Sequence, residues 1–387
     1  MEGNKCSVIK AGLGKGKTTA SIAHINSHKY DRIIVLTPRR TFAKSVCNRL
    51  NDECKGIEFV MYSNLKGKDY MIRNPFIVIQ VESLNRLELN TNDKTLLLCD
   101  EVESVLFQMT VSKTHKEKHI QNLDMLERLF RESTKIICLD AFISNRTLTT
   151  LRLMNIPYTY YNYTLPLEDR TCIRIKEKDK FLTKLLLDLG QNKKIFLFSS
   201  SNNTLVSDFI PSIKKKYPNK KVIEYHSKFT SLDLTNINDN WKDADVIACT
   251  STITVGCNFD LKDVFDKVYV YANASSKNLV RDIFQATYRI RYIRDKEMIY
   301  CIDRRHFGVN LSTYKKEIEQ DLKMKYQYIV NQYEQHLQMN YPQQKTPEWI
   351  KQLVLSNIYE QNMSIMLLEQ MFQRYLTECS YEHEEID

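Results

Sequence analysis

The stretch that decides the fold is Ala11-Gly12-Leu13-Gly14-Lys15-Gly16-Lys17-Thr18-Thr19, which follows the apolar run Cys6-Ser7-Val8-Ile9. It has the form of a phosphate-binding loop, [Ala/Gly]-x4-Gly-Lys-Thr. Such a loop stands where a strand passes into a helix, and the residues on both sides have those two patterns. A glycine-rich turn with a lysine can also be only a turn, but this placement favours nucleotide binding.

The chemistry of phosphate binding explains the residue types in this loop. Gly12, Gly14 and Gly16 let consecutive backbone N–H groups turn toward a phosphate. Lys17 supplies a positive charge to the β- and γ-phosphate oxygens, and Thr18 offers its hydroxyl to Mg²⁺. The N-terminus of the helix that follows also favours anions. We therefore expect these residues, together with Thr19, to bind a nucleotide.

Length and composition leave room for two domains and an appendage. The chain has 387 residues, of which 43% are hydrophobic, and 56 Lys+Arg against 47 Asp+Glu give a net charge of +9. Domains contain roughly 100–200 residues each. The mild basic excess is compatible with a polyanionic partner, and equally with solvated lysines on an ordinary surface.

The cysteine pattern and the lack of long apolar runs point to an intracellular, soluble protein without membrane contact. The ten cysteines form no Cys-x2-Cys pair, and most lie in strand-like apolar runs. Buried thiols in a reducing compartment are the expected reading, and a zinc site or disulfide framework is not expected. We see no signal peptide and no apolar run of the about 18–20 residues that span a bilayer.

Short apolar runs alternate with helical patterns over the first 300 residues, which predicts an α/β fold with parallel sheets. Twelve strands are too many for one ordinary open sheet, so two sheets are expected. We place the domain boundary in the proline-bearing stretch 163–169 and expect domains at 1–166, 167–308 and 309–387, the last helical with helices at 311–338 and 347–378. The expected strands are 6–11, 32–37, 57–62, 76–81, 95–100, 135–140, 171–176, 194–199, 221–226, 245–250, 267–272 and 297–302.

An acidic pair follows the fifth expected strand, in Leu96-Leu97-Leu98-Cys99-Asp100-Glu101-Val102-Glu103. A carboxylate at the C-terminal end of a buried strand faces the crevice where α/β sheets bind ligands. Asp100 is expected to hold Mg²⁺, and Glu101 to orient or deprotonate the attacking water. Glu103 is placed near the site without a catalytic step. An acidic surface turn is the alternative.

A third cluster, Gln285-Ala286-Thr287-Tyr288-Arg289-Ile290-Arg291, ends the second half. Arginines two residues apart do not share a helix face, so both can reach one partner only from a helix end or a turn. An arginine of this cluster that reaches a γ-phosphate from a second domain would act as an arginine finger, only when the two lobes close. A solvated basic helix face is the alternative.

The order of these three motifs resembles the superfamily 2 helicases over about residues 5–305. Further matches are Thr37-Pro38-Arg39-Arg40-Thr41 (motif Ia), Gln80–Leu84 (Ib), Leu139–Ala141 (III), Phe198–Ser201 (IV), and Thr250–Gly256 with Phe259-Asp260 (V). The Asp-Glu-Val-Glu box and motifs Ia and V look most like the herpesvirus origin-binding proteins and related helicases of large DNA viruses. Motif VI departs from the family pattern, since Tyr288 replaces a glycine and Arg291 comes one residue early, so Arg289 is the safer finger.

The resemblance implies two RecA-like lobes and an ATP-dependent helicase or translocase that acts in viral DNA replication, in host cytoplasm or nucleus. It implies ATP and Mg²⁺ as ligands, phosphate contacts from Gly256 and Arg291, and single-stranded or forked DNA as partner, with RNA possible. The residues implied to contact the nucleic-acid backbone, which would make binding salt-sensitive, are Thr37, Arg39, Arg40, Ser83, Ser199 and Thr250.

Four alternatives stay open from the sequence. The ATPase could be a translocase or packaging motor without strand separation, or the P-loop could bind nucleotide without turnover in a scaffold. The tyrosines of 158–163 could stack bases, although their spacing equally suits a strand with one exposed face. The C-terminal segment 309–387 is expected to pack on the second lobe, with docking of a replication-protein partner as the alternative.

Overall fold

The computed structural model describes residues 4–65, 67, 71–163, 170–227, 236–253, 259–305, 310–325 and 347–386. The chain divides into two compact units. Unit 1 comprises Met1–Leu165 and Tyr314–Tyr359, and unit 2 comprises Pro166–Thr313 and Glu360–Asp387. The predicted boundary residues 164–169 lie outside the described residues. Each unit contains its own sheet.

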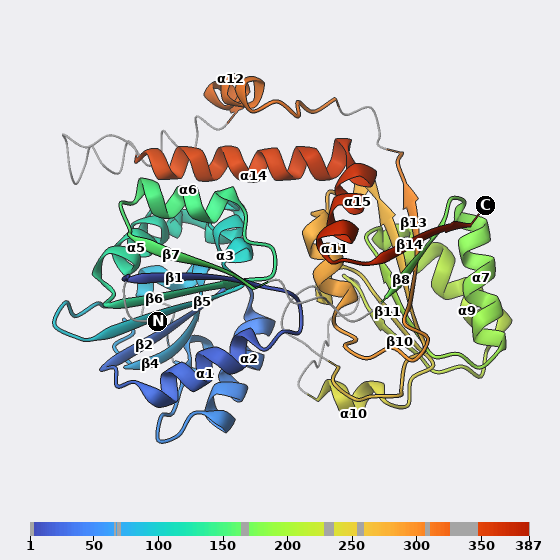
Figure 1. The fold of residues 1–387 in the computed structure, drawn as a ribbon, viewed down its shortest axis with the longest axis horizontal. Coiled ribbons are helices and arrows are strands. Elements are labelled where there is room, and N and C mark those ends of the chain that lie inside the picture. The colour runs from blue at the N-terminus through green and yellow to red at the C-terminus, as the bar shows by residue number, and fades with distance from the viewer. Residues whose placement is uncertain are drawn as a thin grey trace. The chain divides into compact units, whose positions relative to one another are not determined.

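Unit 1 is built on a seven-stranded parallel sheet. Strands β2 and β5 are buried along their whole length, because helices cover both faces of the sheet. Helices α1 and α2 cover one face, and α3, α5 and α6 cover the other (Figure 1). The strands in sheet order are β3 Val60–Met61, β4 Phe76–Gln80, β2 Arg32–Thr37, β5 Thr95–Asp100, β6 Lys135–Asp140, β1 Cys6–Ala11 and β7 Tyr158–Tyr163.

The helices of unit 1 connect these strands and add a C-terminal layer. They are α1 Lys17–Ser27, α2 Arg40–Glu53, α3 Val102–Gln108, α4 Ser112–His115, α5 His119–Glu132, α6 Asn145–Leu153, α12 Lys315–Lys325 and the first part of α14 Glu348–Met366. Short 3-10 helices occur at Tyr62–Asn64, Val81–Arg86 and Lys116–Lys118. The Trp349 indole Nε1 donates to Glu127 Oε2 at 2.9 Å, which fixes the start of α14 on α5.

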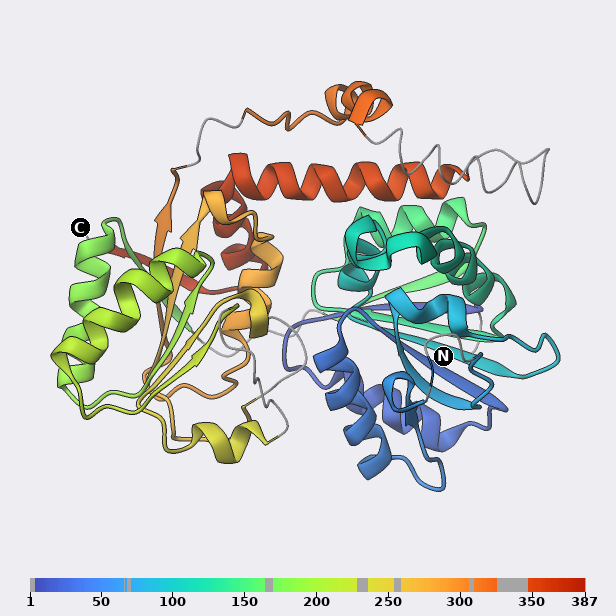
Figure 2. The ribbon, with the colours of Figure 1, turned by 180° about the vertical axis from the view of Figure 1, so that it is seen from behind.

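Unit 2 has a second seven-stranded parallel sheet with a different set of covering helices. Phe181 of α7 and Phe209 pack against Tyr269 and Tyr271 on one face. Helices α11 and α15 cover the other face (Figures 1 and 2). The strands in sheet order are β10 Val222–Tyr225, β11 Val246–Cys249, β9 Ile195–Ser199, β12 Lys267–Asn273, β13 Glu297–Asp303, β8 Thr171–Ile175 and β14 Glu382–Ile386.

The helices of unit 2 follow the same alternation. They are α7 Lys178–Gly190, α8 Asn202–Thr204, α9 Ile210–Lys216, α10 Ile237–Trp241, α11 Val280–Thr287, the second part of α14 and α15 Leu368–Glu378. A π-helical turn at Leu205–Phe209 leads into α9, and 3-10 turns occur at Ser251–Ile253 and Ala274–Ser276.

The two sheets have the same topology. Numbered within its own unit, each runs 3-4-2-5-6-1-7. The seventh strand of unit 1 is β7, which follows α6 directly. The seventh strand of unit 2 is β14, which comes from the C-terminal end of the chain and pairs with β8. The two units therefore have the same α/β topology. The last strand of unit 2, β14, follows α15 in the chain.

The predicted fold class of two parallel α/β units is confirmed, and most expected strands lie within two residues of their predicted ends. The prediction was wrong at 57–62, where the strand is only Val60–Met61. The tail, expected to be helical and to pack on the second lobe, also contains the strand β14 Glu382–Ile386, and its part Tyr314–Tyr359 belongs to unit 1. No helix among the described ranges is long and apolar enough to cross a membrane, and the nine cysteines described are buried and free.

Two stacked histidines in unit 1 make the stability of the fold depend on pH. The rings of His115 and His119 lie 4.8 Å apart. His115 Nδ1 accepts a hydrogen bond from Asn122 Nδ2 at 2.9 Å, and its Nε2 donates to the Gln108 carbonyl at 3.1 Å. Burial, with a smaller contribution from His119, lowers the pKa of His115 to about 4. The neutral ring is therefore part of the folded state.

We expect acid to destabilise the fold through His115. An unfolded histidine has a pKa of about 6.5, whereas the pKa of folded His115 is about 4. The stabilisation is complete above the unfolded pKa and declines as the pH falls toward the folded one, by about 1.4 kcal/mol per pH unit. Urea unfolding at several pH values should show a shallower decline in His115→Gln than in the wild type. Equal declines would contradict this assignment.

Candidate functional site

The loop between β1 and α1 places Lys17 at the first position of a helix. Gly14 and Gly16 have φ values of 73° and 74°, in the left-handed region where a side chain is strained. Lys17 Nζ donates to the carbonyls of Ala11 and Gly12 at 2.7 and 2.9 Å. The ammonium group is thus held inside the loop by two weak acceptors that an anionic phosphate oxygen can replace.

Asp100, the last residue of β5, lies beside this loop. Its side chain is buried, and Thr18 Oγ1 donates to Asp100 Oδ2 at 3.2 Å. Burial raises the pKa of the Asp100 carboxyl and the negative charge of Asp140 adds to the rise, while Lys17 and the Thr18 hydrogen bond oppose it. A bound cation would stabilise the charged carboxylate in the same way as Lys17 does.

The donor set fits Mg²⁺ rather than a metal held by protein ligands alone. Thr18 and Asp100 offer hard oxygen ligands, and Mg²⁺ is bound by one or two carboxylates together with substrate phosphates. The described part of the chain has no group of three or more His, Cys, Asp and Glu side chains that could hold a metal. Thr19, also predicted to bind nucleotide, is exposed, and its hydroxyl accepts a hydrogen bond from Arg49 Nη2 at 2.8 Å.

Glu101 adopts an unusual backbone conformation at the start of α3. Its φ of 60° and ψ of 50° are left-handed, which costs a non-glycine residue about 1–2 kcal/mol. Its carbonyl accepts from the N–H groups of Ser104 and Val105 at 2.9 and 3.0 Å, so the residue caps the helix. Backbone strain of this kind clusters at functional sites. The chain passes here from β5, which ends at the buried Asp100, into α3.

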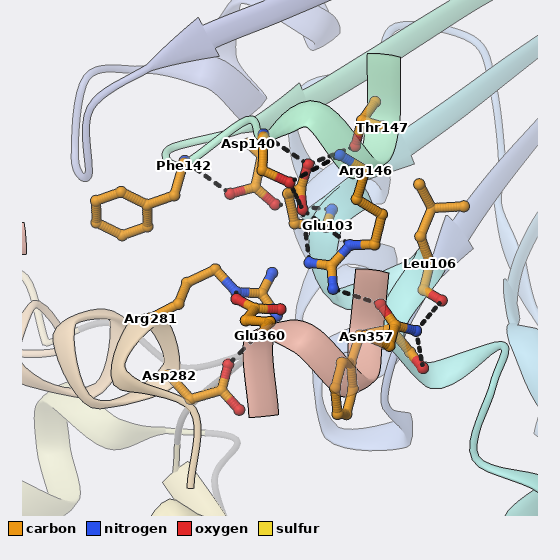
Figure 3. Close-up of polar contacts among 12 residues, drawn as sticks. Glu103, Leu106, Asp140, Phe142, Arg146, Thr147, Arg281, Asp282, Asn357 and Glu360 are labelled. Carbon is orange, nitrogen blue, oxygen red and sulfur yellow. Dashed lines mark hydrogen bonds and ion pairs between the residues drawn. The ribbon is translucent and has the colours of Figure 1, made fainter. Parts of the chain in front are cut away.

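Glu103 is the centre of a buried polar network (Figure 3). Its backbone N–H donates to Asp140 Oδ2 at 3.0 Å, which links the acidic motif to the end of β6. Its carboxylate accepts from Arg146 Nη2 at 2.5 Å and from Thr147 Oγ1 at 2.5 Å. Ser144 adds its N–H and hydroxyl at 2.8 Å each. Removing one partner of such a buried ion pair typically costs about 3–5 kcal/mol.

Motif VI lies in a turn at the end of α11, as the spacing of its arginines predicts. The helix ends at Thr287, and the Arg289 carbonyl accepts from Phe259 N at 2.7 Å. Arg170 stacks on the ring of Tyr288 at 4.2 Å and donates to the Ile290 carbonyl at 2.9 Å, which fixes the turn. Gln285 and Arg289 are buried.

Arg291 differs from Arg289 in its surroundings. It is half-exposed and its Nε pairs with Asp260 Oδ1 of motif V at 2.9 Å. This ion pair joins motifs V and VI within unit 2. Gly256, predicted to contact phosphate, lies outside the described residues.

The residues predicted to contact nucleic acid fall into two groups. Arg40 is exposed, and Arg39 and Ser83 are half-exposed, so their side chains are accessible. The other three are buried and bonded inside their units, and their contact with nucleic acid stays a prediction. Thr37 Oγ1 donates to the Ile79 carbonyl at 3.1 Å, Ser199 Oγ donates to the Ser201 carbonyl at 2.9 Å, and the Thr250 and Thr252 hydroxyls are 3.4 Å apart. Hydroxyls at the ends of buried strands bond neighbouring backbone instead of solvent.

Sequence reasoning missed Arg146 and Asn357 and gave Glu103 no role. Arg146 Nη1 donates to Asn357 Oδ1 at 2.5 Å, across more than 200 residues of sequence. The local signal for Arg146 is Ser144, whose hydroxyl accepts from Arg146 N at 3.2 Å and caps α6. Nothing in the local sequence identifies Asn357, because its role depends on where α14 packs.

Comparison with known proteins gives the family. A family model described as origin of replication binding protein matches residues 2–156 and 144–310. A replication origin-binding protein of human herpesvirus 7 is 27% identical over 321 residues, which cover 79% of this chain and 38% of the relative. An African swine fever virus protein named for a helicase/primase complex is 29% identical over 311 residues. These cover 76% of this chain and 28% of that relative. The matched part of this chain thus spans well under half of these relatives.

Solved structures of helicases share the fold. Saccharomyces cerevisiae Dbp5 bound to RNA and ADP BeF3 matches with a TM-score of 0.55 at 11% identity, covering 93% of this chain and 90% of that one. The helicase MrfA bound to DNA matches with a TM-score of 0.52 at 15% identity. The match covers 93% of this chain and 50% of MrfA. These likenesses confirm the two-lobed RecA-like helicase fold. Because the family model matches most of the chain, from the P-loop to β13, the chain belongs to the origin of replication binding protein family, as its motifs predict.

Proposed function

We propose that this chain is the ATP-driven motor of a viral DNA-replication helicase, which couples ATP hydrolysis to movement along a nucleic-acid strand. The observation that carries the proposal is the contact between Thr18 of the P-loop and the buried Asp100, beside Lys17. A loop for phosphate and a carboxylate for its metal form one site in unit 1. The family match and the names of the viral relatives support replication as the setting.

In the proposed mechanism, the P-loop holds the nucleotide and Asp100 holds its metal. Lys17 exchanges the Ala11 and Gly12 carbonyls for the β/γ-phosphates, and the N–H groups at the start of α1 bind phosphate oxygens. Thr18 and Asp100 are the residues that would hold Mg²⁺. When bound, Mg²⁺ offsets the phosphate charge that develops in the reaction.

Glu101 is proposed to orient and deprotonate the attacking water. Its left-handed backbone stands between the end of β5 at Asp100 and the start of α3, and the two neighbouring carboxylates are assigned different roles. The network around Glu103 holds the helix that Glu101 caps. Glu103 itself is saturated by Arg146, Ser144 and Thr147, which leaves it a structural role.

Arg289 of unit 2 is proposed as the arginine finger, with Gln285 and Gly256 beside the phosphates. Support comes from its place in the turn fixed by Phe259 and Arg170 and from the order of motifs. Arg291 is assigned a supporting role and not that of the finger, because the Asp260 carboxylate already neutralises its charge.

The nucleic-acid partner is proposed to be single-stranded or forked DNA, contacted through phosphates by Arg39, Arg40 and Ser83. The replication names of the relatives favour DNA, and RNA remains an outcome of the test. Residues 309–387, mostly outside the family match, are proposed to include the site for a replication-protein partner.

We expect Lys17 and Glu101 to affect different steps. The ATPase rate of the wild type should rise with single-stranded DNA. Lys17→Ala should lose nucleotide affinity and turnover, whereas Glu101→Gln should keep affinity and lose about 10²-fold or more in kcat, the usual share of general base catalysis. Steady-state ATPase assays with single-stranded DNA, duplex DNA and RNA, and binding of a fluorescent ATP analogue, measure both quantities.

Lys15→Ala, in the same loop, is the matched control and should retain activity. If no polymer stimulates hydrolysis, the helicase proposal fails. If Glu101→Gln turns over like the wild type, the chain binds nucleotide without using this carboxylate. Stimulation without strand separation on a forked substrate would instead indicate a translocase.

The same assay should separate the two arginines of motif VI. Arg289→Ala should lower kcat by about 10³-fold, the size of effect of an arginine finger. Arg291→Ala should have a much smaller effect, because its partner is Asp260. A larger loss in Arg291→Ala would move the finger to that residue.

Arg40 should contribute one phosphate contact. We expect Arg40→Ala to weaken binding of single-stranded DNA and to lower the slope of log K against log salt by about 0.7, the value for one released counterion on a single strand. Arg128→Ala removes another exposed arginine of unit 1, which pairs with Glu132, and should leave the slope unchanged. Equal slopes in all three proteins, measured by fluorescence anisotropy, would exclude Arg40 from the interface.

A further inference from the structure

The buried carboxylate of Glu103 is connected to a helix that lies outside the family match. Arg146 uses Nε and Nη2 for Glu103, at 3.0 and 2.5 Å, and donates its remaining Nη1 to Asn357 Oδ1 of α14 at 2.5 Å (Figure 3). Asn357 and Arg146 are 3% and 4% exposed. Helix α14 thus accepts a hydrogen bond from the arginine that holds the acidic motif.

Asn357 also holds the far end of α3. Its Nδ2 donates to Thr110 Oγ1 at 2.7 Å and lies 3.3 Å from the carbonyls of Leu106 and Phe107. These are carbonyls at the C-terminal end of a helix, which lack partners within it. One amide side chain therefore caps α3 with its nitrogen and binds Arg146 with its oxygen.

Helix α3 needs such support. It has only seven residues, Val102–Gln108, and an isolated helix shorter than about 12 residues is marginal in water. Glu101 at its N-terminal end is in the left-handed conformation, which persists only where the surroundings impose it. The position of Glu101 is therefore set by what holds α3 at both ends, Glu103 and Arg146 at one and Asn357 at the other.

We propose that Asn357 is a positioning residue for Glu101, and that α14 keeps α3 in its catalytic orientation. The kinetic consequence rests on the proposed ATPase function, whereas the structural consequence does not. Asn357 acts through Arg146 and through the end of α3 and has no contact with Glu101 among the hydrogen bonds of the described residues.

The docking of α14 does not depend on Asn357 alone. Trp349, Ile350 and Leu353 are each 1% exposed, and the Trp349 indole is bonded to Glu127. The same helix has separate polar contacts within unit 2, where Ser364 Oγ accepts from Val280 N of α11 at 3.3 Å. Replacing Asn357 should thus loosen α3 and leave α11 unchanged.

The test is Asn357→Leu in the full chain, compared with Asn362→Leu. Asn362 lies on the same helix, is also buried and makes a polar contact elsewhere, from Nδ2 to the Ser312 carbonyl at 2.7 Å. Hydrogen exchange should be at least about tenfold faster at 102–108 in Asn357→Leu, with α11 unchanged, because the cap of α3 is lost. Asn362→Leu should leave 102–108 at the wild-type rate.

In DNA-stimulated ATPase assays, Asn357→Leu should lower kcat about tenfold and change KM less than about twofold, the pattern for loss of an interaction that acts in the transition state. Unchanged exchange at 102–108 would overturn the proposal. So would faster exchange accompanied by an unchanged kcat, or a fall in kcat shared equally by Asn362→Leu. If the wild type hydrolyses no ATP, the ATPase proposal fails, and the exchange rates alone decide whether Asn357 holds α3.

Discussion

The buried charge of Asp100 is the constraint on which the proposed ATP site depends. A carboxylate that is 4% exposed needs nearby positive charge or hydrogen bonds. Lys17 and Thr18 provide both, from the start of α1. The sheet order β5-β6-β1 places the ends of these strands at one edge, with Asp140 of β6 between them. The parallel sheet thus brings the carboxylates of Asp100 and Asp140 to the neighbouring Lys17 and Thr18, from which they are far apart in sequence.

Asp140 joins this edge to a second buried network. It accepts the N–H of Glu103 with one oxygen and the N–H of Phe142 with the other. Glu103 in turn binds Arg146 at the start of α6, and Arg146 binds Asn357 of α14. The conformation of Glu101 therefore depends on side chains from four elements. This explains how a strained residue is held at the end of a two-turn helix.

Local sequence patterns were sufficient to predict the parallel sheets, and they also pointed to the residues proposed for the core of the site. Fully buried strands such as β2 and β5 appear as continuous apolar runs, and the glycine loop and acidic pair have local signatures. The strand β14 has no such signature, since Glu382–Ile386 is rich in charged residues and pairs only because the chain returns to the edge of unit 2. For Thr37, Ser199 and Thr250 a motif shows the residue type but not the burial that the structure shows, so their contact with nucleic acid stays a prediction. Asn357 could not be found at all, because its partners are set by tertiary packing.

The measurement that tests the account most directly is the affinity for a fluorescent ATP analogue with and without Mg²⁺, in the wild type and in Asp100→Asn. If Asp100 and Thr18 hold the metal, Mg²⁺ should tighten binding to the wild type by about tenfold or more, or about 1.4 kcal/mol. Asp100→Asn should lose this gain and keep its metal-free affinity, because the P-loop and Lys17 remain. An equal gain in both proteins, or none in the wild type, would contradict the assignment of Asp100 as the metal-binding carboxylate.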